Sequence, residues 1–193
     1  YQALIQKLDE FIRKYYKNQL IRGLIYAVSA FLIFYLIIAT LEYFGRFSTG
    51  VRTVMFWTFI VLNAYFLVRF ICIPLLKLYH FGKVISHEQA ADIIGKHFSN
   101  VSDKLFNTLQ LKKLSENDNS ELLHASVNQK IKDLQPVPFS NAIDLSRNKK
   151  YVKYAAAPLL VFVVLLFAAP SFIKDSTKRI IEHSTYFEKP APF

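Results

Sequence analysis

Three long apolar runs constrain this chain more than any other feature of its sequence. The first covers residues 23–41 and the third covers residues 154–173, and neither contains a charged residue. The second is uncharged over residues 53–68 and continues past Arg69 to residue 76. A helix needs about 20 apolar residues to cross a hydrocarbon core of about 30 Å. The sequence therefore predicts three transmembrane helices.

The composition agrees with a membrane protein and excludes several other classes. Hydrophobic residues make up 53% of the 193 residues and charged residues only 20%, whereas soluble domains carry about 25% charge. The 18 phenylalanines and 11 tyrosines exclude a disordered or collagen-like chain. A single cysteine, Cys72, excludes an internal disulfide framework and a multi-cysteine zinc site.

The sequence motifs that would indicate catalysis are missing. There is no dinucleotide-binding glycine motif, no phosphate loop and no nucleophile elbow. His87 and Glu88 resemble the start of a zinc-binding helix, but Ala91 stands where the second histidine would be. We therefore expect no enzyme, no catalytic residues, no cofactor and no metal site.

Basic residues near the ends of the apolar runs predict the orientation of the chain. Only Arg46 and Arg52 lie between the first two runs, whereas twelve lysines and arginines lie between the second and third. The candidate interfacial basic residues before the first run are Arg13, Lys14, Lys17 and Arg22. We expect the N-terminus and residues 77–153 inside, with the hairpin at 42–52 and the C-terminus outside. The net charge of +10 then indicates anionic lipids as partners, and no nucleic acid, because the charges flank the spans.

Two polar segments have the periodicity of amphipathic helices. In residues 1–22 the apolar side chains share one face, which predicts an interfacial helix on the inner leaflet or against the inner domain. These side chains are Leu4, Ile5, Leu8, Phe11, Ile12, Tyr15 and Tyr16. Residues 77–153 predict a small helical domain, which should lean on the membrane-proximal helices or on a partner because its own core is small.

Local signals divide this small domain into helices. Ser86 and Gln89 have the spacing of a capping box, which predicts a helix start. A later helix should present one apolar face and end at Pro136. The residues of that face are Leu123, Val127, Ile131 and Leu134. A last helix is expected to start near Ser140 and to run unbroken into the third apolar run.

Three polar residues within the apolar runs are candidate intramembrane contacts, namely Arg69, Asn63 and Ser29. Arg69 is a functional candidate because ionisable residues are costly inside a membrane. The simpler interpretation is that its side chain snorkels toward the inner face. Asn63 can hydrogen-bond to Ser29 or to a neighbouring backbone, as polar residues do between membrane helices.

Several short segments of the sequence occur in the same order in one known family. They include Leu8-Asp-Glu-Phe-Ile-Arg-Lys-Tyr-Tyr, Ile73-Pro-Leu-Leu-Lys-Leu, Ile85-Ser-His-Glu-Gln-Ala-Ala, Asp103-Lys-Leu-Phe-Asn-Thr-Leu-Gln-Leu and Pro190-Ala-Pro-Phe. In these segments the chain resembles the N-terminal membrane region of a family of large Bacteroidota envelope proteins of unknown function. The resemblance implies a bacterial inner membrane, a cytoplasmic N-terminus, and a periplasmic C-terminus that continues into a β-rich region. It implies no activity.

These observations predict an all-α protein with three transmembrane helices, an N-terminal amphipathic helix and a small cytoplasmic helical domain. The expected segments are an interfacial helix at 1–22, a hairpin of two spans at 23–76, the helical domain at 77–153, a third span at 154–173 and a periplasmic lead-in at 174–193. The leading hypothesis is an inner-membrane anchor and assembly subunit of a cell-envelope complex, with other envelope proteins or a second copy as partners. The alternatives are a transport or channel component, with Arg69 and Asn63 lining a path, and a membrane sensor.

Overall fold

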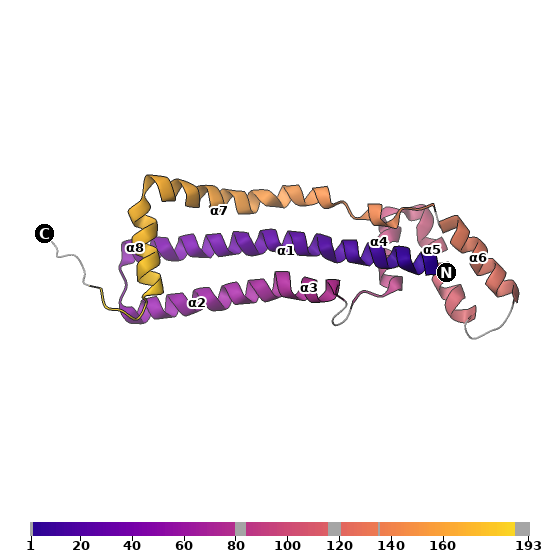
Figure 1. Ribbon diagram of the computed structural model, residues 1–193, viewed down its shortest axis with the longest axis horizontal. Coiled ribbons are helices and arrows are strands. Elements are labelled where there is room, and N and C mark those ends of the chain that lie inside the picture. Colours follow the sequence, from indigo (N-terminus) through magenta and orange to yellow (C-terminus); the bar gives the residue numbers. More distant parts are fainter. Residues whose placement is uncertain (1, 80–83, 116–120, 135, 188–193) are drawn as a thin grey trace. The chain divides into compact units, whose positions relative to one another are not determined.

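The computed structural model describes residues 2–79, 84–115, 121–134 and 136–187, and every regular element in these residues is a helix (Figure 1). The all-α prediction is therefore confirmed. The α-helices are α1 (Gln2–Gly45), α2 (Thr49–Leu67), α3 (Ile73–Leu78), α4 (His87–His97), α5 (Ser99–Ser115), α6 (Glu121–Leu134), α7 (Lys149–Ala168) and α8 (Pro170–Ile181). A π-helix, η1 (Val68–Cys72), joins α2 to α3, and two short 3-10 helices, η2 (Phe139–Ala142) and η3 (Leu145–Asn148), precede α7.

The chain divides into two compact units. Tyr1–Gln19 and Leu75–Ser146 form the first, here called the small-helix unit. Leu20–Pro74 and Arg147–Phe193 form the second, here called the long-helix unit. Because α1 is one continuous helix of 44 residues, its N-terminal part belongs to the first unit and the rest to the second.

The long-helix unit contains the three predicted apolar helices, and each is long and apolar enough to cross a membrane. In this unit α1 lies between α2 and α7 (Figure 1). Aromatic pairs join the helices. The ring centroid of Phe31 lies 5.5 Å from that of Phe59 on α2, and the ring centroid of Tyr35 lies 5.7 Å from that of Phe162 on α7. Other faces of these helices expose large apolar side chains, as lipid-facing surfaces do.

The third apolar helix ends earlier than the sequence analysis predicts. We expected a span to residue 173, but α7 ends at Ala168 and α8 begins at Pro170. Pro170 lacks the N–H that would continue the helix, and the residue before a proline disfavours the helical region. Ala169 accordingly has φ −141° and ψ 65°. The chain turns there, and α8 runs across the ends of the other helices (Figure 1).

The π-helix in the second apolar helix has a cause in the sequence. Pro74 cannot donate the hydrogen bond that the Phe70 carbonyl would accept in an α-helix. The turn widens before the proline, and the Ile73 N–H bonds to the Val68 carbonyl. Gly23 of α1 lies against this widened turn, where an added Cβ would meet the Phe70 carbonyl oxygen. The absence of a side chain at Gly23 therefore lets the two backbones approach.

The small-helix unit has a continuous apolar core that includes the N-terminal part of α1. Leu4, Leu8, Phe11, Ile12 and Tyr16 are buried with apolar residues of α4, α5 and α6. Val127, Ile131 and Leu134 of α6 are buried in the same core, as predicted, whereas the side chain of Leu123 lies outside the described residues. The N-terminal apolar face thus packs on protein in this structure.

The predicted capping box at the start of α4 is confirmed. The Ser86 hydroxyl accepts the Gln89 N–H at 3.2 Å, and the Gln89 side chain accepts the Ser86 N–H at 3.0 Å. Both arms satisfy backbone groups that the first turn of a helix leaves free. The Tyr16 hydroxyl accepts the Ile85 N–H at 3.0 Å, which ties the start of α4 to α1.

The expectation that one helix runs unbroken from near Ser140 into the third apolar run is wrong. Ile143 is extended, with φ −105° and ψ 107°, and separates η2 from η3. Asp144 accepts the Ser146 N–H at 2.9 Å and the Ser146 hydroxyl at 2.6 Å. An aspartate that bonds to the backbone two residues later favours a turn over a helix.

Candidate functional site

A fully buried glutamate at the end of α1 is the most unusual polar feature of the long-helix unit. Glu42 has no exposed surface, although it follows directly on the uncharged run at 23–41. It is also the only acidic residue between Glu10 and Glu88. A buried carboxylate is costly unless positive charges and hydrogen bonds compensate for the lost water.

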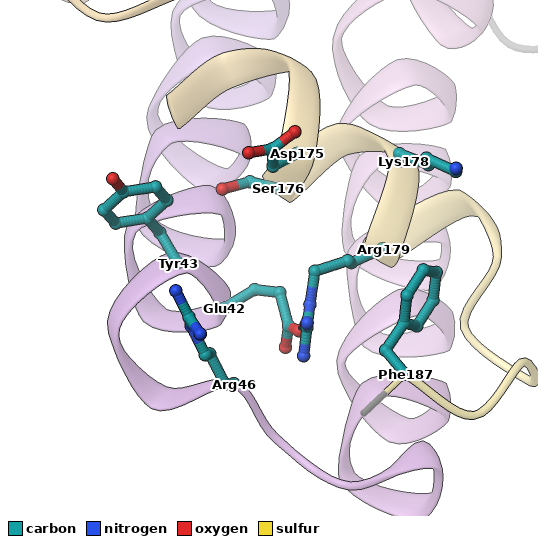
Figure 2. Close-up of a pocket in the computed structure, with 8 residues that line it drawn as sticks. All are labelled: Glu42, Tyr43, Arg46, Asp175, Ser176, Lys178, Arg179 and Phe187. Atoms are coloured by element: carbon teal, nitrogen blue, oxygen red, sulfur yellow. Dashed lines mark hydrogen bonds and ion pairs between the residues drawn. The ribbon is translucent and has the colours of Figure 1, made fainter. Parts of the chain in front are cut away.

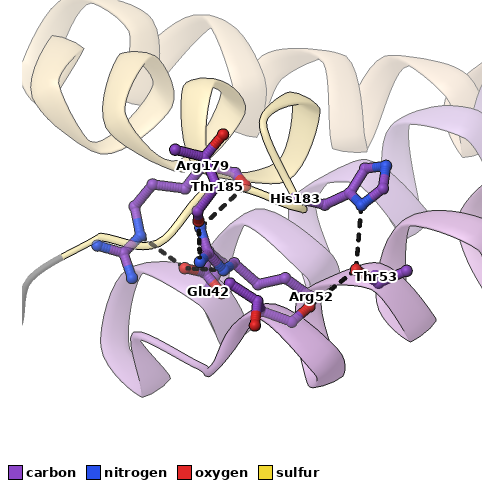
Figure 3. A network of polar contacts seen from close by, with 7 residues as sticks. Glu42, Arg52, Thr53, Arg179, His183 and Thr185 are labelled. Carbon is purple, nitrogen blue, oxygen red and sulfur yellow. Dashed lines mark hydrogen bonds and ion pairs between the residues drawn. The ribbon is translucent and has the colours of Figure 1, made fainter.

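Two arginines from other segments supply that compensation (Figure 3). The Arg179 Nε, on α8, donates to Glu42 Oε1 at 2.6 Å. The Arg52 guanidinium, in the first turns of α2, lies with its Nε 4.0 Å from the same oxygen. Arg52 is only 2% exposed, so it too depends on protein partners. The three side chains are called the Glu42 cluster below.

Arg52 also holds the segment that follows α8. Its Nη2 donates to the Thr185 carbonyl at 2.7 Å and its Nη1 to the Arg179 carbonyl at 3.4 Å. These bonds satisfy carbonyls at and beyond the C-terminal end of α8, where a helix leaves acceptors free and where its dipole favours positive charge. One arginine thus links α2 both to α8 and to the segment after it.

Aromatic contacts strengthen the same attachment. The Phe187 ring lies 4.8 Å from the Arg52 guanidinium and 5.1 Å from that of Arg179. Such cation–π contacts contribute more when the charge is shielded from water. Nearby, the His183 ring stacks on Phe56 at 4.5 Å, and its Nδ1 lies 3.1 Å from the Thr53 hydroxyl. Three side chains of the segment 179–187, those of Arg179, His183 and Phe187, therefore contact α1 or α2.

The Glu42 cluster joins all three apolar helices at one end. Glu42 lies in the last turn of α1, Arg52 lies in the first turn of α2, and the turn at Ala169 connects α7 to α8, which carries Arg179. Phe172 and Ile173 of α8 pack with Ala39 of α1 and add an apolar contact. The arrangement is a structural clamp, since its charged groups bond mainly to one another and to backbone carbonyls.

The predicted intramembrane residues lie apart from this clamp and serve their own helices. The Ser29 hydroxyl donates to the Ile25 carbonyl at 2.7 Å, and the Asn63 amide donates to the Phe59 carbonyl at 2.8 Å. Of the two partners suggested for Asn63, the structure thus shows the neighbouring backbone and not Ser29. Arg69 lies in the π-helix with an exposed side chain and has no ion pair among the described residues.

The predicted interfacial basic residues divide between the two units. Arg13 and Lys17 are exposed on the N-terminal part of α1. The Lys14 ammonium instead donates to the Ser140 carbonyl at 2.8 Å, which fixes η2 to α1. Arg22 lies in the long-helix unit, with its guanidinium 5.8 Å from the Tyr151 ring on α7.

Sequence reasoning missed Glu42 although the sequence contained a signal. Arg46 and Arg52 are readily counted as charges that orient the chain in the membrane, and that interpretation hides the role of Arg52 as a partner for an acidic residue. An isolated glutamate at the end of an apolar run, with arginines four and ten residues later, favours an ion pair in a helical hairpin. The contribution of Arg179 had no such signal, because its position depends on the turn at Ala169.

Comparison with protein-family models, with curated proteins and with solved structures finds no match for this chain. The resemblance to the Bacteroidota envelope family therefore stays a prediction, and the residues themselves carry the functional argument.

Proposed function

We propose that this chain is an inner-membrane anchor and assembly subunit of a cell-envelope complex. In this proposal the three apolar helices cross the membrane, and the small-helix unit and the N-terminus are cytoplasmic. The end of the long-helix unit that carries the Glu42 cluster is periplasmic. The segment after α8 then couples a periplasmic region to partners in the membrane.

The observation that carries the proposal is the attachment of residues 179–187 to α1 and α2. A simple membrane tether needs no contact between its outgoing segment and the other spans. Here Arg52 bonds to the Thr185 carbonyl at 2.7 Å, and Arg179 bonds to Glu42 at 2.6 Å. These contacts fix the direction in which the chain leaves the helices, which suits a subunit that must position an outer region.

The transport alternative has weaker support. A polar pathway needs side chains that are free to meet a substrate, whereas Ser29 and Asn63 bond to carbonyls of their own helices. The π-helix around Arg69 favours it, because such turns are frequent at functional sites. Pro74 already explains that turn on structural grounds.

Purification in mild detergent tests the proposal with variants on α8. A tagged wild-type chain should recover envelope proteins in fixed stoichiometry, and Arg179→Gln should recover less of them while remaining in the membrane fraction. Lys174→Gln changes an exposed charge on the same helix and should behave as wild type. Recovery of the chain without partners, or ion or solute flux through the purified chain in liposomes, would contradict the anchor function.

A further inference from the structure

A cavity of about 280 Å³ lies beside the Glu42 cluster, between the end of α1 and α8 (Figure 2). Its lining includes Asp175 and Ser176 of α8, and Glu42, Tyr43 and Arg46 of α1 and the turn after it. Lys178, Arg179 and Phe187 complete its lining. All of these residues belong to the long-helix unit.

Two buried polar atoms in the residues that line this cavity have no hydrogen-bond partner in the described part of the chain. They are Glu42 Oε2 and the Ser176 hydroxyl, on side chains that are 0% and 1% exposed. An unsatisfied buried acceptor typically costs about 1–3 kcal/mol, and more when it is charged. The carboxylate oxygen requires a donor, and the hydroxyl can either donate or accept.

The charges around the cavity are complementary to a ligand that carries both signs. Arg46 and Lys178 are exposed, and neither has an ion pair with a described residue. Arg179 uses its Nε for Glu42, so its terminal nitrogens can take a second acceptor. The exposed Asp175 carboxylate supplies a negative charge on the opposite helix. The guanidinium groups match a phosphate, which they bind well, and the carboxylates match an ammonium.

The position of the cavity along α1 narrows the choice of ligand. Glu42 directly follows 19 uncharged residues, which span most of a hydrocarbon core of about 30 Å. If α1 crosses the membrane as proposed, the cavity lies at the level of the lipid headgroups. The exposed rings of Tyr43 and Phe44 on the same turn are typical of that level.

We propose that this cavity binds the phosphoethanolamine headgroup of an aminophospholipid. Arg46 and Arg179 donate to the phosphate, with Lys178 as a further charge at the rim. The ammonium donates to Glu42 Oε2 and Asp175, and Ser176 completes the contacts. This inference rests on the proposed membrane function, because it requires the end of α1 at the headgroup level.

Native mass spectrometry of the purified full chain tests the headgroup with three lipids of identical acyl chains. Phosphatidylethanolamine should be retained about fivefold or more over phosphatidylcholine, which lacks ammonium N–H donors, and over phosphatidylglycerol, which lacks the ammonium. Equal retention of the three lipids would overturn the inference. Displacement of the bound lipid by millimolar inorganic phosphate would assign the site to a soluble anion and would also overturn it.

Variants locate the binding within the protein. Arg46 has φ 42°, a left-handed conformation that favours glycine, so Arg46→Gly removes the guanidinium without straining the backbone. Arg46→Gly should weaken the retention of both phosphatidylethanolamine and phosphatidylglycerol several-fold, because both lipids carry the phosphate that Arg46 binds, and Lys178→Gln should weaken that retention less. Lys174→Gln, an exposed neighbour outside the cavity, should bind as wild type. Unchanged retention by Arg46→Gly would overturn the assignment.

Extraction of the wild-type chain with alkaline carbonate separates this inference from the proposed function. A chain that stays in the membrane pellet but shows no headgroup preference would refute the lipid site alone. A chain released by carbonate would refute the membrane anchor.

Discussion

At the scale of single residues, Glu42 is the position on which the long-helix unit depends most. Its carboxylate is fully buried beside Arg52 and Arg179, and removing one member of such a group strands the others without water or countercharge. The cluster is therefore sensitive to substitution of any of its three residues. The other acidic residues of the unit that the structure describes, Asp175 and Glu182, are exposed.

We predict that Glu42→Gln lowers the free energy of unfolding of the detergent-solubilised chain by about 3–5 kcal/mol. The amide keeps the shape of the side chain but leaves the buried Arg52 guanidinium and the partly buried Arg179 guanidinium without a carboxylate. Arg179→Gln should cost less than Arg52→Gln, because Arg179 is 16% exposed and Arg52 only 2%. Denaturant unfolding followed by Trp57 fluorescence measures these differences.

Glu182→Gln is the matched control, since it makes the same change at an exposed position on the segment after α8. It should alter the free energy of unfolding by less than about 0.5 kcal/mol. Equal effects of Glu42→Gln and Glu182→Gln would show that the Glu42 cluster is not a clamp.

At the scale of elements, the helix cap at the start of α4 lies beside a carboxyl group, so the stability of this helix start depends on pH. The Ser86 hydroxyl donates to the Glu88 carboxylate and lowers its pKa, with a further contribution from the Glu88 backbone N–H. A carboxyl whose pKa is lower in the folded state adds stability above its unfolded pKa and loses it as the pH falls through the folded value. The stabilising effect of Glu88 is therefore present at neutral pH and lost in acid.

We predict that Ser86→Ala costs the small-helix unit about 1 kcal/mol at neutral pH through loss of the cap. Glu88→Gln should also destabilise the unit at neutral pH, and its difference from wild type should vanish in acid. Circular dichroism during denaturant unfolding at several pH values measures both. Ser126→Ala, at an exposed position within α6, should be neutral. A difference between Glu88→Gln and wild type that grows in acid would contradict the sign of the pKa shift.

The contact between α1 and the π-helix is a second feature at this scale. We predict that Gly23→Ala destabilises the long-helix unit by about 1–3 kcal/mol, because the new Cβ would overlap the Phe70 carbonyl oxygen. Gly50 in α2 has no atoms near an added Cβ, so Gly50→Ala should be neutral or slightly stabilising. Thermal unfolding in detergent compares the two, and equal midpoints would show that the helices do not approach closely at Gly23.

At the scale of the whole molecule, the small-helix unit is assembled from two distant parts of the chain. Phe11, which is fully buried, comes from α1, whereas most of the core around it comes from Leu75–Ser146. We predict that Phe11→Ala costs this unit about 3–5 kcal/mol. Phe106 on α5 is 43% exposed, so Phe106→Ala should cost much less.

Hydrogen exchange of the amides in α4 and α5 measures how much each of these two variants destabilises the unit within the full chain. Phe11→Ala should accelerate exchange in both helices, because their core loses a large side chain. Unchanged protection would mean that α1 does not belong to the core of the unit.

The sequence predicted the helices far better than the site. Long uncharged runs and the Ser86–Gln89 spacing depend on local physics: the three long apolar helices and the capping box are confirmed, whereas membrane crossing stays a prediction. Pro170 indicates where the third helix ends, but the apolar residues on both sides of it favoured a longer span. The Glu42 cluster required contacts between residues 137 positions apart, which no local pattern encodes.

Orientation in the membrane is the central claim, and thiol labelling tests it most directly. Single cysteines are introduced at Ser48, in the turn between α1 and α2, and at Ser126 on α6, both exposed, in a Cys72→Ala background. In intact spheroplasts a membrane-impermeant reagent should label Ser48→Cys and not Ser126→Cys, and both should react after permeabilisation. Labelling of Ser126→Cys but not Ser48→Cys in intact spheroplasts would contradict the proposed anchor and its direction of coupling.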